Sequence, residues 1–391
     1  HSSFYGVSAC LSPAFAGIFL LNKKRGGAHG GEGWMAQRRI MTILKALACG
    51  LVAATAPLWL IAPAAADDVE AFYKGRNVDV LVGYAPGGLN DALSRVVARH
   101  LAKKIPGNPN LVVRNMSSAG PIGIANHMFN AADKDGSVIA SLDRTGAQLA
   151  IRGEMNVRFD PMKFIWLGSV ASFEQDAYLV LVNSGHAAKT AADLKSGVAK
   201  ALIGSVGAGS TNQVFAMLAK DALKLNIETI RGYRGTGPIF LAMQSNEVDG
   251  IVTGISTMMT TQSDMWKSGK VRALVQFGRA TRHPSLPDVP TGRELAPDAE
   301  TLALIKFAEL PFAMSRPFIA PPNVPADRAQ ALRKAFMATM NDQEFIAELE
   351  KINFDDLSPI DGDAIVELLQ GAMKTPKSII ERYNQIEKAS G

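Results

Sequence analysis

Three short segments of the sequence combine glycines with hydroxyl or amide side chains just before a predicted helix, and each follows a predicted strand. The amino termini of helices leave N–H groups unpaired and carry partial positive charge, so such turns hold carboxylates or phosphates without a formal cation. In any single turn, a Ser, Thr, Asn or Asp can instead act only as a helix cap. Three turns in one chain favour anion binding. The candidate residues are Pro86, Gly87, Gly88, Leu89, Asn90 and Asp91 in the first turn, Gly207, Gly209, Ser210, Thr211 and Asn212 in the second, and Tyr233, Arg234 and Gly235 in the third.

Other uses of these turns fail on particular residues. A nucleotide-binding P-loop needs Gly-Lys-Ser/Thr, but no lysine follows Gly209, and a dinucleotide fingerprint needs a third glycine where Asn212 stands. A serine nucleophile on a G-x-S-x-G elbow is also missing there. The histidines after residue 66 are scattered and form no metal-binding spacing, so we expect neither a metal nor a cofactor.

Two arginines are candidates for recognising a ligand carboxylate. Arg144 stands at the end of a predicted strand and Arg234 in the third turn, and a guanidinium grips a carboxylate through two parallel hydrogen bonds. Alternatively, Arg144 pairs with Asp143 or with solvent, and the same alternative is favoured for Arg234. Asp91 and Asp249 are single carboxylates without a visible partner, which leaves general acid/base catalysis unsupported.

The first 66 residues have the pattern of a removable leader. Arg38, Arg39 and Lys45 precede an apolar run, 46–61, which ends in small residues before Asp67. This order is typical of a secretory signal with a cut after Ala66, and Met35 is the natural start, which makes 1–34 an upstream extension. A retained membrane anchor is the alternative, but the run is interrupted by Pro57 and is shorter than a spanning helix.

Subtracting this leader changes what the composition implies. The full chain has 41 Lys and Arg against 36 Asp and Glu. Six of these bases and one acid lie in the predicted leader, so the remaining chain has 35 of each and no net charge. Cys10 and Cys49 leave with it. We therefore expect no nucleic-acid partner, no disulfide and no thiol chemistry.

The elements that must position these turns alternate between strands and helices. Alternation of this kind predicts parallel strands joined by crossover helices, with ligands bound at the carboxyl ends of the strands. Strands are predicted at 78–84, 111–114, 138–143, 165–170, 177–182, 201–206, 228–230, 250–253 and 271–277. Helices are predicted at 89–101, 126–131, 191–200, 213–223, 238–244 and 257–268.

The C-terminal part has a different texture. Prolines at 284, 287 and 290 predict a loop, 312–320 predicts one or two short strands, and helices are predicted at 326–340, 342–349 and 360–386. Charged residues along one face of these late helices favour packing on the outside of a lobe.

The ordered set of short motifs resembles the receptors of tripartite tricarboxylate transporters, the Bug or TctC family of extracytoplasmic solute-binding proteins. The resemblance covers nearly all of the chain after the leader. The matching segments are 84–91 with Ser94-Arg95, 112–115, Asp135-Gly136, 207–210, 233–235, 248–250, 287–291, Arg316-Pro317 and Pro321-Pro322.

The resemblance implies an α/β fold of two lobes, the type II periplasmic binding protein or Venus-flytrap fold. The first lobe would comprise 67–170 and 277–391, and the second 171–276, with the chain crossing near Val170 and returning near Gln276. A carboxylate-bearing organic acid would be trapped between the lobes by a periplasmic monomer that is not an enzyme, and passed to membrane permease subunits. Ser141, Thr145 and Asp249 join the turn residues as expected ligand contacts.

Two departures from the family pattern lie near the expected cleft. Asn115 is followed by Met-Ser-Ser-Ala-Gly-Pro where the family has Pro-Gly-Ala-Gly-Gly, and Gln213 stands where the family often has His. They put the ligand in doubt, but not the fold. Two other roles stay open: a receptor that feeds a two-component sensor kinase, and a secreted hydrolase or isomerase on the same fold.

Overall fold

The structure is a computed structural model that describes residues 64–84, 86–116, 120–207, 210–352, 354 and 356–389. The described residues belong to one compact unit, Pro63–Gly391. The predicted extension and nearly all of the predicted leader lie outside the described residues. The expected cut after Ala66 falls in the first turn of helix α2, Ala64–Tyr73.

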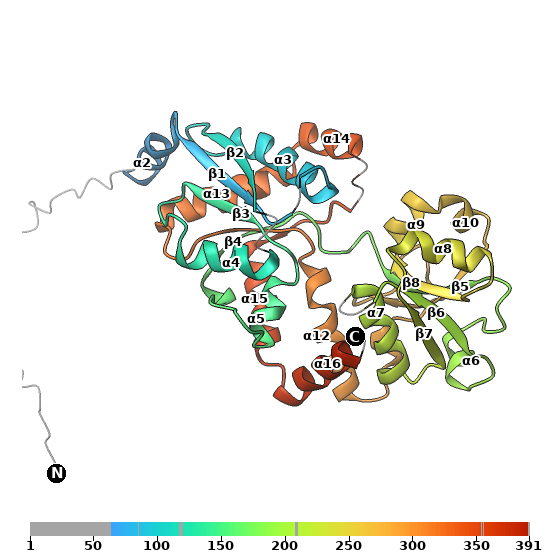
Figure 1. The fold of residues 1–391 in the computed structure, drawn as a ribbon. Coiled ribbons are helices and arrows are strands. Elements are labelled where there is room, and N and C mark those ends of the chain that lie inside the picture. Colours follow the sequence, from blue (N-terminus) through green and yellow to red (C-terminus); the bar gives the residue numbers. More distant parts are fainter. Residues whose placement is uncertain are drawn as a thin grey trace, which may run out of the picture. The chain divides into compact units, whose positions relative to one another are not determined.

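The first sheet has six strands in the order β11-β4-β10-β3-β1-β2 (Figure 1). Strand β1 pairs in parallel with β2 and β3, whereas β10 and β11 are antiparallel to their neighbours. The strands are β1 Asn77–Val82, β2 Asn110–Asn115, β3 Val138–Ser141, β4 Ile165–Ser169, β10 Pro317–Ala320 and β11 Ile360–Asp361.

The second sheet has five strands in the order β7-β6-β8-β5-β9. Strand β6 is parallel to β7 and β8, because crossover helices connect these three strands, and β5 is antiparallel to β8 and β9. The strands are β5 Tyr178–Asn183, β6 Ala201–Ser205, β7 Ile227–Arg231, β8 Gly250–Gly254 and β9 Val271–Phe277. Both sheets are therefore mixed.

Helices cover both faces of each sheet. The buried apolar side chains form four clusters, two around the first sheet and two around the second. The helices are α2 Ala64–Tyr73, α3 Leu89–Ala102, α4 Gly120–Asn130, α5 Gly146–Ile151, α6 Ala191–Lys195, α7 Thr211–Met217, α8 Thr236–Gln244, α9 Ile255–Thr261, α10 Ser263–Lys267, α11 Gly292–Leu295, α12 Ala299–Ala313, α13 Ala326–Met340, α14 Gln343–Lys351, α15 Gly362–Met373 and α16 Lys377–Ala389.

Helix α12 belongs to the cores of both sheets. Leu310 and Met314, at its end, pack in a cluster of the first sheet, while Leu304, Phe307 and Phe312 pack in a cluster of the second. The sequence pattern does not indicate this helix, and the strand predicted from residue 312 is wrong over its first residues, which still belong to α12. The reason is physical: a helix that is buried over most of its surface carries no narrow apolar stripe, and Pro311 interrupts the pattern further.

The C-terminal segment does not return to the first sheet directly after Gln276. Gln276 pairs with Thr291, and α11 packs on β9, so this part of the chain still lies against the second sheet. The return runs through α12 into β10. The predicted helix 360–386 is two helices, and α16 packs in the core of the second sheet through Ile379, Tyr383 and Ile386.

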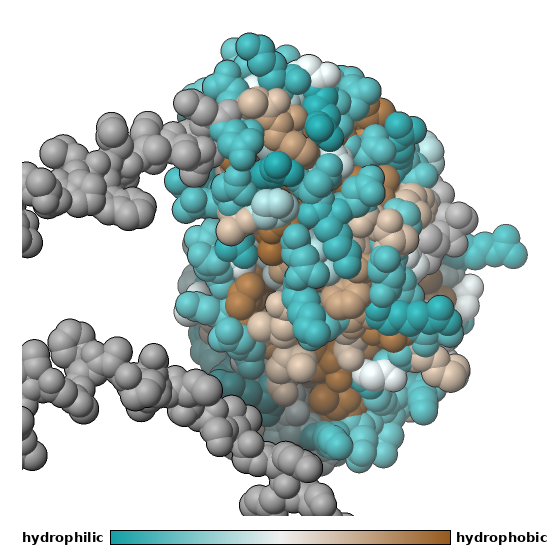
Figure 2. Space-filling view, turned by 90° about the vertical axis from the view of Figure 1, so that its left-hand side faces the viewer, coloured by the Kyte–Doolittle hydropathy of each residue, from teal (hydrophilic) through white to brown (hydrophobic). Residues whose placement is uncertain are grey.

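The surface seen in Figure 2 is mostly hydrophilic, with apolar side chains in small patches. Among the described residues, no helix is both long and apolar enough to span a bilayer.

Candidate ligand-binding cleft

The first turn is shaped by its own aspartate. Gly87 has a φ of 85°, which favours glycine, and its N–H donates to Asp91 Oδ2 at 2.9 Å. Arg95 Nε and Asn115 Nδ2 also donate to the Asp91 carboxylate, at 3.1 Å and 2.8 Å. Burial raises the pKa of Asp91, but these three donors outweigh it and hold the pKa below its usual value. Asp91 therefore has partners, and it positions the turn.

The residues of the first turn, from Pro86 to Asn90, differ in their exposure to solvent. Pro86, Gly87 and Gly88 are exposed, and Leu89 is 46% exposed at the start of α3. The Oδ1 atom of Asn90 is buried and accepts no hydrogen bond from any described residue. An unsatisfied acceptor beside the amino terminus of α3 is a group that a ligand donor can satisfy.

The second turn uses most of its polar groups internally. Ser210 caps α7 by accepting from Gln213 N, and its hydroxyl donates to the Gly207 carbonyl at 2.7 Å. Asn212 is buried, accepts from Val206 N at 3.0 Å and donates to Val252 O at 2.8 Å, so it ties the turn to β8. Thr211 turns its side chain toward a candidate residue of the first sheet, Arg144. Gly209 lies outside the described residues.

The third turn lies away from the two pockets that Arg144 lines. Tyr233 donates its hydroxyl to Glu247 at 2.7 Å, and this hydrogen bond raises the pKa of Tyr233 to about 12. Arg234 is exposed, and Gly235, with a φ of 105°, precedes α8. No described residue of this turn lines either of the two pockets near Arg144.

Asp249 lies at the wrong end of the second sheet for a ligand contact. It precedes β8, accepts from Leu202 N at 2.8 Å near the start of β6, and faces His186. The turns at 207–212 and 233–237 follow the carboxyl ends of β6 and β7. We therefore remove Asp249 from the candidate site, because its carboxylate joins the amino ends of two strands.

Two arginines that the topology brings together mark the candidate site. Arg144 follows β3, and Arg316 precedes β10, the strand that pairs with β3. Both line a pocket of about 280 Å³, which we call the outer pocket. Its walls come from both sheets and from the connections between them: Leu89, Arg144, Phe173, Asp176, Tyr178, Gly254, Ser256, Thr257, Thr260, Phe312, Ser315, Arg316, Phe354 and Asp356.

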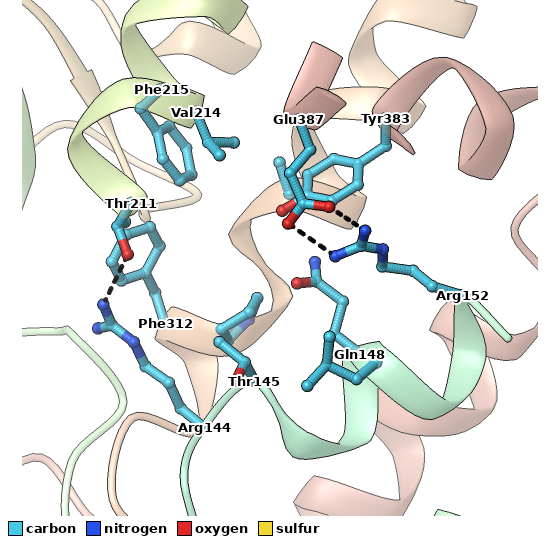
Figure 3. A pocket seen from close by; sticks show the side chains of 13 residues that line it. Arg144, Thr145, Gln148, Arg152, Thr211, Val214, Phe215, Phe312, Tyr383 and Glu387 are labelled. Atoms are coloured by element: carbon cyan, nitrogen blue, oxygen red, sulfur yellow. Dashed lines mark hydrogen bonds and ion pairs between the residues drawn. The ribbon is translucent and has the colours of Figure 1, made fainter. Parts of the chain in front are cut away.

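A second pocket, which we call the inner pocket, adjoins Arg144 on its other side. Figure 3 shows Arg144 and Thr211 facing each other across one end of it and the pair of Arg152 and Glu387 at the other end. Its volume is about 160 Å³. It is lined by Arg144, Thr145, Gln148, Leu149, Arg152, Thr211, Val214, Phe215, Ala308, Pro311, Phe312, Tyr383 and Glu387.

Neither arginine of the outer pocket has an acidic partner among the described residues. Arg144 donates to Thr211 Oγ1 at 3.5 Å, and its guanidinium carbon lies 4.7 Å from the centre of the Phe312 ring. Arg316 donates to Ser315 O at 2.8 Å, while its buried Nε atom has no hydrogen-bond partner in the described part of the chain. Within the described part of the chain, no ion pair involves Arg144 or Arg316. Burial lowers the pKa of Arg144, and the nearby charge of Arg316 lowers it further, so an anion bound in this pocket would favour the charged guanidinium and oppose both effects.

The carboxylates nearby are already engaged. Asp143 accepts from Thr145 N at 2.8 Å, from the Thr145 hydroxyl and from the Tyr84 hydroxyl, so it fixes the turn that carries Arg144. Asp176 is buried and accepts from Ala177 N at 2.7 Å and from the backbone and hydroxyl of Ser256. Burial raises the pKa of Asp176. Ser141, at the end of β3, is buried.

One further cluster has the residue types of a metal site. His100, Asp342 and Glu344 bring their side chains close together on α3 and at the start of α14. Lys104 pairs with Asp342, Lys103 pairs with Glu344 at 3.0 Å, and His100 bonds Glu348 at 2.7 Å. Two lysines and a second glutamate already satisfy this cluster, and the geometry favours an ion-pair network between α3 and α14.

The structure thus brings Leu89, Arg144, Thr145 and Thr211 to the two pockets. Sequence reasoning missed several other lining residues. In the sequence, Arg316 belongs to a segment predicted as strand, and only its place in the Arg316-Pro317 motif marks it. Tyr178 begins the strand β5, and Phe312 and Gln148 lie on helices, positions that look like ordinary core residues in a sequence.

Known proteins similar to this chain belong to one group of transport receptors and their relatives. A family model described as tripartite tricarboxylate transporter family receptor matches residues 93–385. A protein of Bordetella pertussis from the UPF0065 group is 26% identical over 315 residues, which cover 79% of this chain and 90% of that protein. Protein BugT of the same organism is 29% identical over 251 residues, 63% of this chain and 72% of its own length.

A solved structure shares the fold. The TctC solute binding protein from Polaromonas is 21% identical and superimposes with a TM-score of 0.59, covering 79% of this chain and 99% of that chain. At this identity the likeness concerns the fold, and it confirms the predicted two-lobed binding-protein fold.

Proposed function

The chain belongs to the tripartite tricarboxylate transporter receptor family, and we propose that it captures a small organic acid in the outer pocket. The single observation that supports this proposal is the pair of Arg144 and Arg316, which line one pocket without an acidic partner among the described residues. Guanidinium groups bind carboxylates through charged, two-pronged hydrogen bonds, and burial strengthens them.

Further donors of the outer pocket suit the same ligand. Burial raises the pKa of Tyr178, so its hydroxyl stays protonated and can donate a hydrogen bond. Thr257, at the start of α9, adds a hydroxyl to the wall of the pocket, whereas the hydroxyl of its neighbour Ser256 already donates to Asp176. A pocket of about 280 Å³ is near the lower end of ordinary ligand sites, which favours a ligand of few heavy atoms.

Binding between two lobes gives the receptor two states. Arg144 and Arg316 come from segments next to the first sheet, and Tyr178, Ser256 and Thr257 from segments of the second. A ligand that touches both groups favours the closed arrangement, because only that arrangement makes all the contacts. We propose that the closed form is the one that delivers the acid to the membrane permease, and that the predicted leader directs the chain to the periplasm.

Titration calorimetry with a panel of organic acids tests the site. We expect one acid to bind at about micromolar Kd or better, and Arg144→Ala or Arg316→Ala to weaken it by about tenfold or more, since a charged hydrogen bond contributes about 1.5–3 kcal/mol. Arg234→Ala is the matched control, because it removes an exposed arginine that lines neither pocket. Unchanged affinity in both pocket variants would place the ligand elsewhere.

A further inference from the structure

We propose that the ligand is a carboxylic acid with one aromatic ring, whose carboxylate lies at Arg144 and Arg316 while its ring occupies the inner pocket. This inference rests on the proposed function and specifies its ligand class. The proposed function uses only the outer pocket, and this inference assigns a role to the inner pocket.

Arg144 stands at the boundary between the two pockets. Arg144 and Phe312 line both of them, so the pockets meet at this stacked pair. The Phe312 ring contacts the guanidinium of Arg144, whose hydrogen bond to Thr211 is long. Donor N–H groups of Arg144 therefore remain for a carboxylate, and a group attached to that carboxylate can extend past Phe312 into the inner pocket.

The inner pocket has the walls and the size for a ring. Its apolar lining combines small aliphatic side chains with aromatic ones: Val214, Ala308, Pro311, Phe215, Phe312 and Tyr383. Its volume of about 160 Å³ is close to that of an engineered apolar cavity of about 150 Å³ that binds benzene. A ring placed there lies beside Phe215 and Phe312, whose own rings are 5.2 Å apart. Aromatic side chains favour such a partner through offset or edge-to-face contacts.

The polar groups of the inner pocket are already paired, which argues against a second carboxylate there. Arg152 binds Glu387 through two nitrogens, and its Nε donates to Asn384 at 2.7 Å. Gln148 donates to the Phe307 carbonyl at 2.7 Å. A second carboxylate would have to displace Glu387 from Arg152, whereas a ring leaves the pair intact.

The test compares acids of differing shape and charge by titration calorimetry on the protein without its leader. The probes are phenylacetate, hexanoate, succinate and citrate. We expect phenylacetate to bind about tenfold or more tightly than hexanoate, which has the same charge, because the rigid ring fills the pocket at a lower cost in conformational entropy. Tight binding of succinate or citrate without phenylacetate would overturn this inference and leave the proposed function standing. If neither these four acids nor any other organic acid of the calorimetry panel binds, both this inference and the proposed function are wrong.

Two variants locate the ring. Ala308→Leu narrows the inner pocket and should weaken phenylacetate by about tenfold while a short acid such as acetate binds as before. Val214→Ala enlarges the pocket, cannot clash on folding, and should raise the affinity for naphthylacetate relative to phenylacetate. If neither variant changes the ratio between ring-bearing and short acids, the ring does not lie in the inner pocket. Circular dichroism melts should be used to check that both variants fold.

Discussion

At the scale of single residues, the candidate site contains two kinds of polar side chain: those that stabilise the turns and those that are free to contact a ligand. The first kind has its polar atoms hydrogen-bonded to nearby backbone or side-chain groups, and it includes Asp91, Asp143, Ser210 and Asn212. Arg144 and Arg316 do not have acidic partners within the described residues. The sequence predicts Asp91, Ser210, Asn212 and Arg144 alike as ligand contacts, and only their partners in the structure distinguish Arg144 from the other three.

Asp91 gives a prediction about stability and pH. Its pKa is lowered in the fold, so its charged form stabilises the protein above the usual carboxyl pKa, and this contribution is lost as the pH falls below 3.8 through the lowered value. We expect Asp91→Ala to reduce the free energy of unfolding by about 2 kcal/mol at pH 7, since it leaves Arg95 and Asn115 without their shared acceptor. Urea denaturation should show this difference shrinking as the pH falls from neutral through the lowered pKa. Asp133→Ala, at an exposed acid, is the control and should change little at either end of that range.

At the scale of elements, most strands and the turns after them could be predicted, because short apolar runs bounded by glycines are a local signal. The stripe of Leu93, Val96, Val97 and Leu101 likewise predicted α3 correctly. What failed depends on the whole fold. Helix α12 has no apolar stripe because two cores bury it, and the approach of Arg316 to Arg144 follows from the pairing of β10 with β3, residues far apart in the chain. Periodicity contains no information about such pairings.

Helices α5 and α16 are joined by a buried ion pair, and its loss should be costly. The Arg152 side chain is 4% exposed and binds Glu387, Asn384 and the face of Tyr383. We expect Arg152→Ala to lower the free energy of unfolding by about 3 kcal/mol, because it removes the charged hydrogen bonds that the buried guanidinium makes to Glu387 and Asn384. Arg382, which is also on α16, forms a more exposed ion pair with Glu300 of α12. We expect Arg382→Ala to lower the free energy of unfolding by less than about 1 kcal/mol. Similar losses in chemical denaturation of the two variants would contradict this account of the buried pair.

At the scale of the whole described unit, two sheets with separate apolar clusters are linked by shared helices. Helix α12 contributes to both cores, α16 leaves the first sheet to pack on the second, and buried Glu309 of α12 accepts from Gly278 N and pairs with Arg293 beside β9. Burial raises the pKa of Glu309, while Arg293 opposes this. These links favour lobes that can change their angle around a ligand but do not fold independently.

Paired substitutions in α12 test this coupling. Leu304 packs in a core of the second sheet and Leu310 in a core of the first, and both are buried. Each Leu→Ala change should cost about 2–5 kcal/mol, because it removes buried methyl groups and leaves a cavity. If α12 makes the two cores one cooperative unit, scanning calorimetry of either variant should show a single transition at a lower temperature, with equal calorimetric and van't Hoff enthalpies. Two transitions, of which Leu304→Ala moves one and Leu310→Ala the other, would show that the lobes unfold separately and that α12 does not couple them.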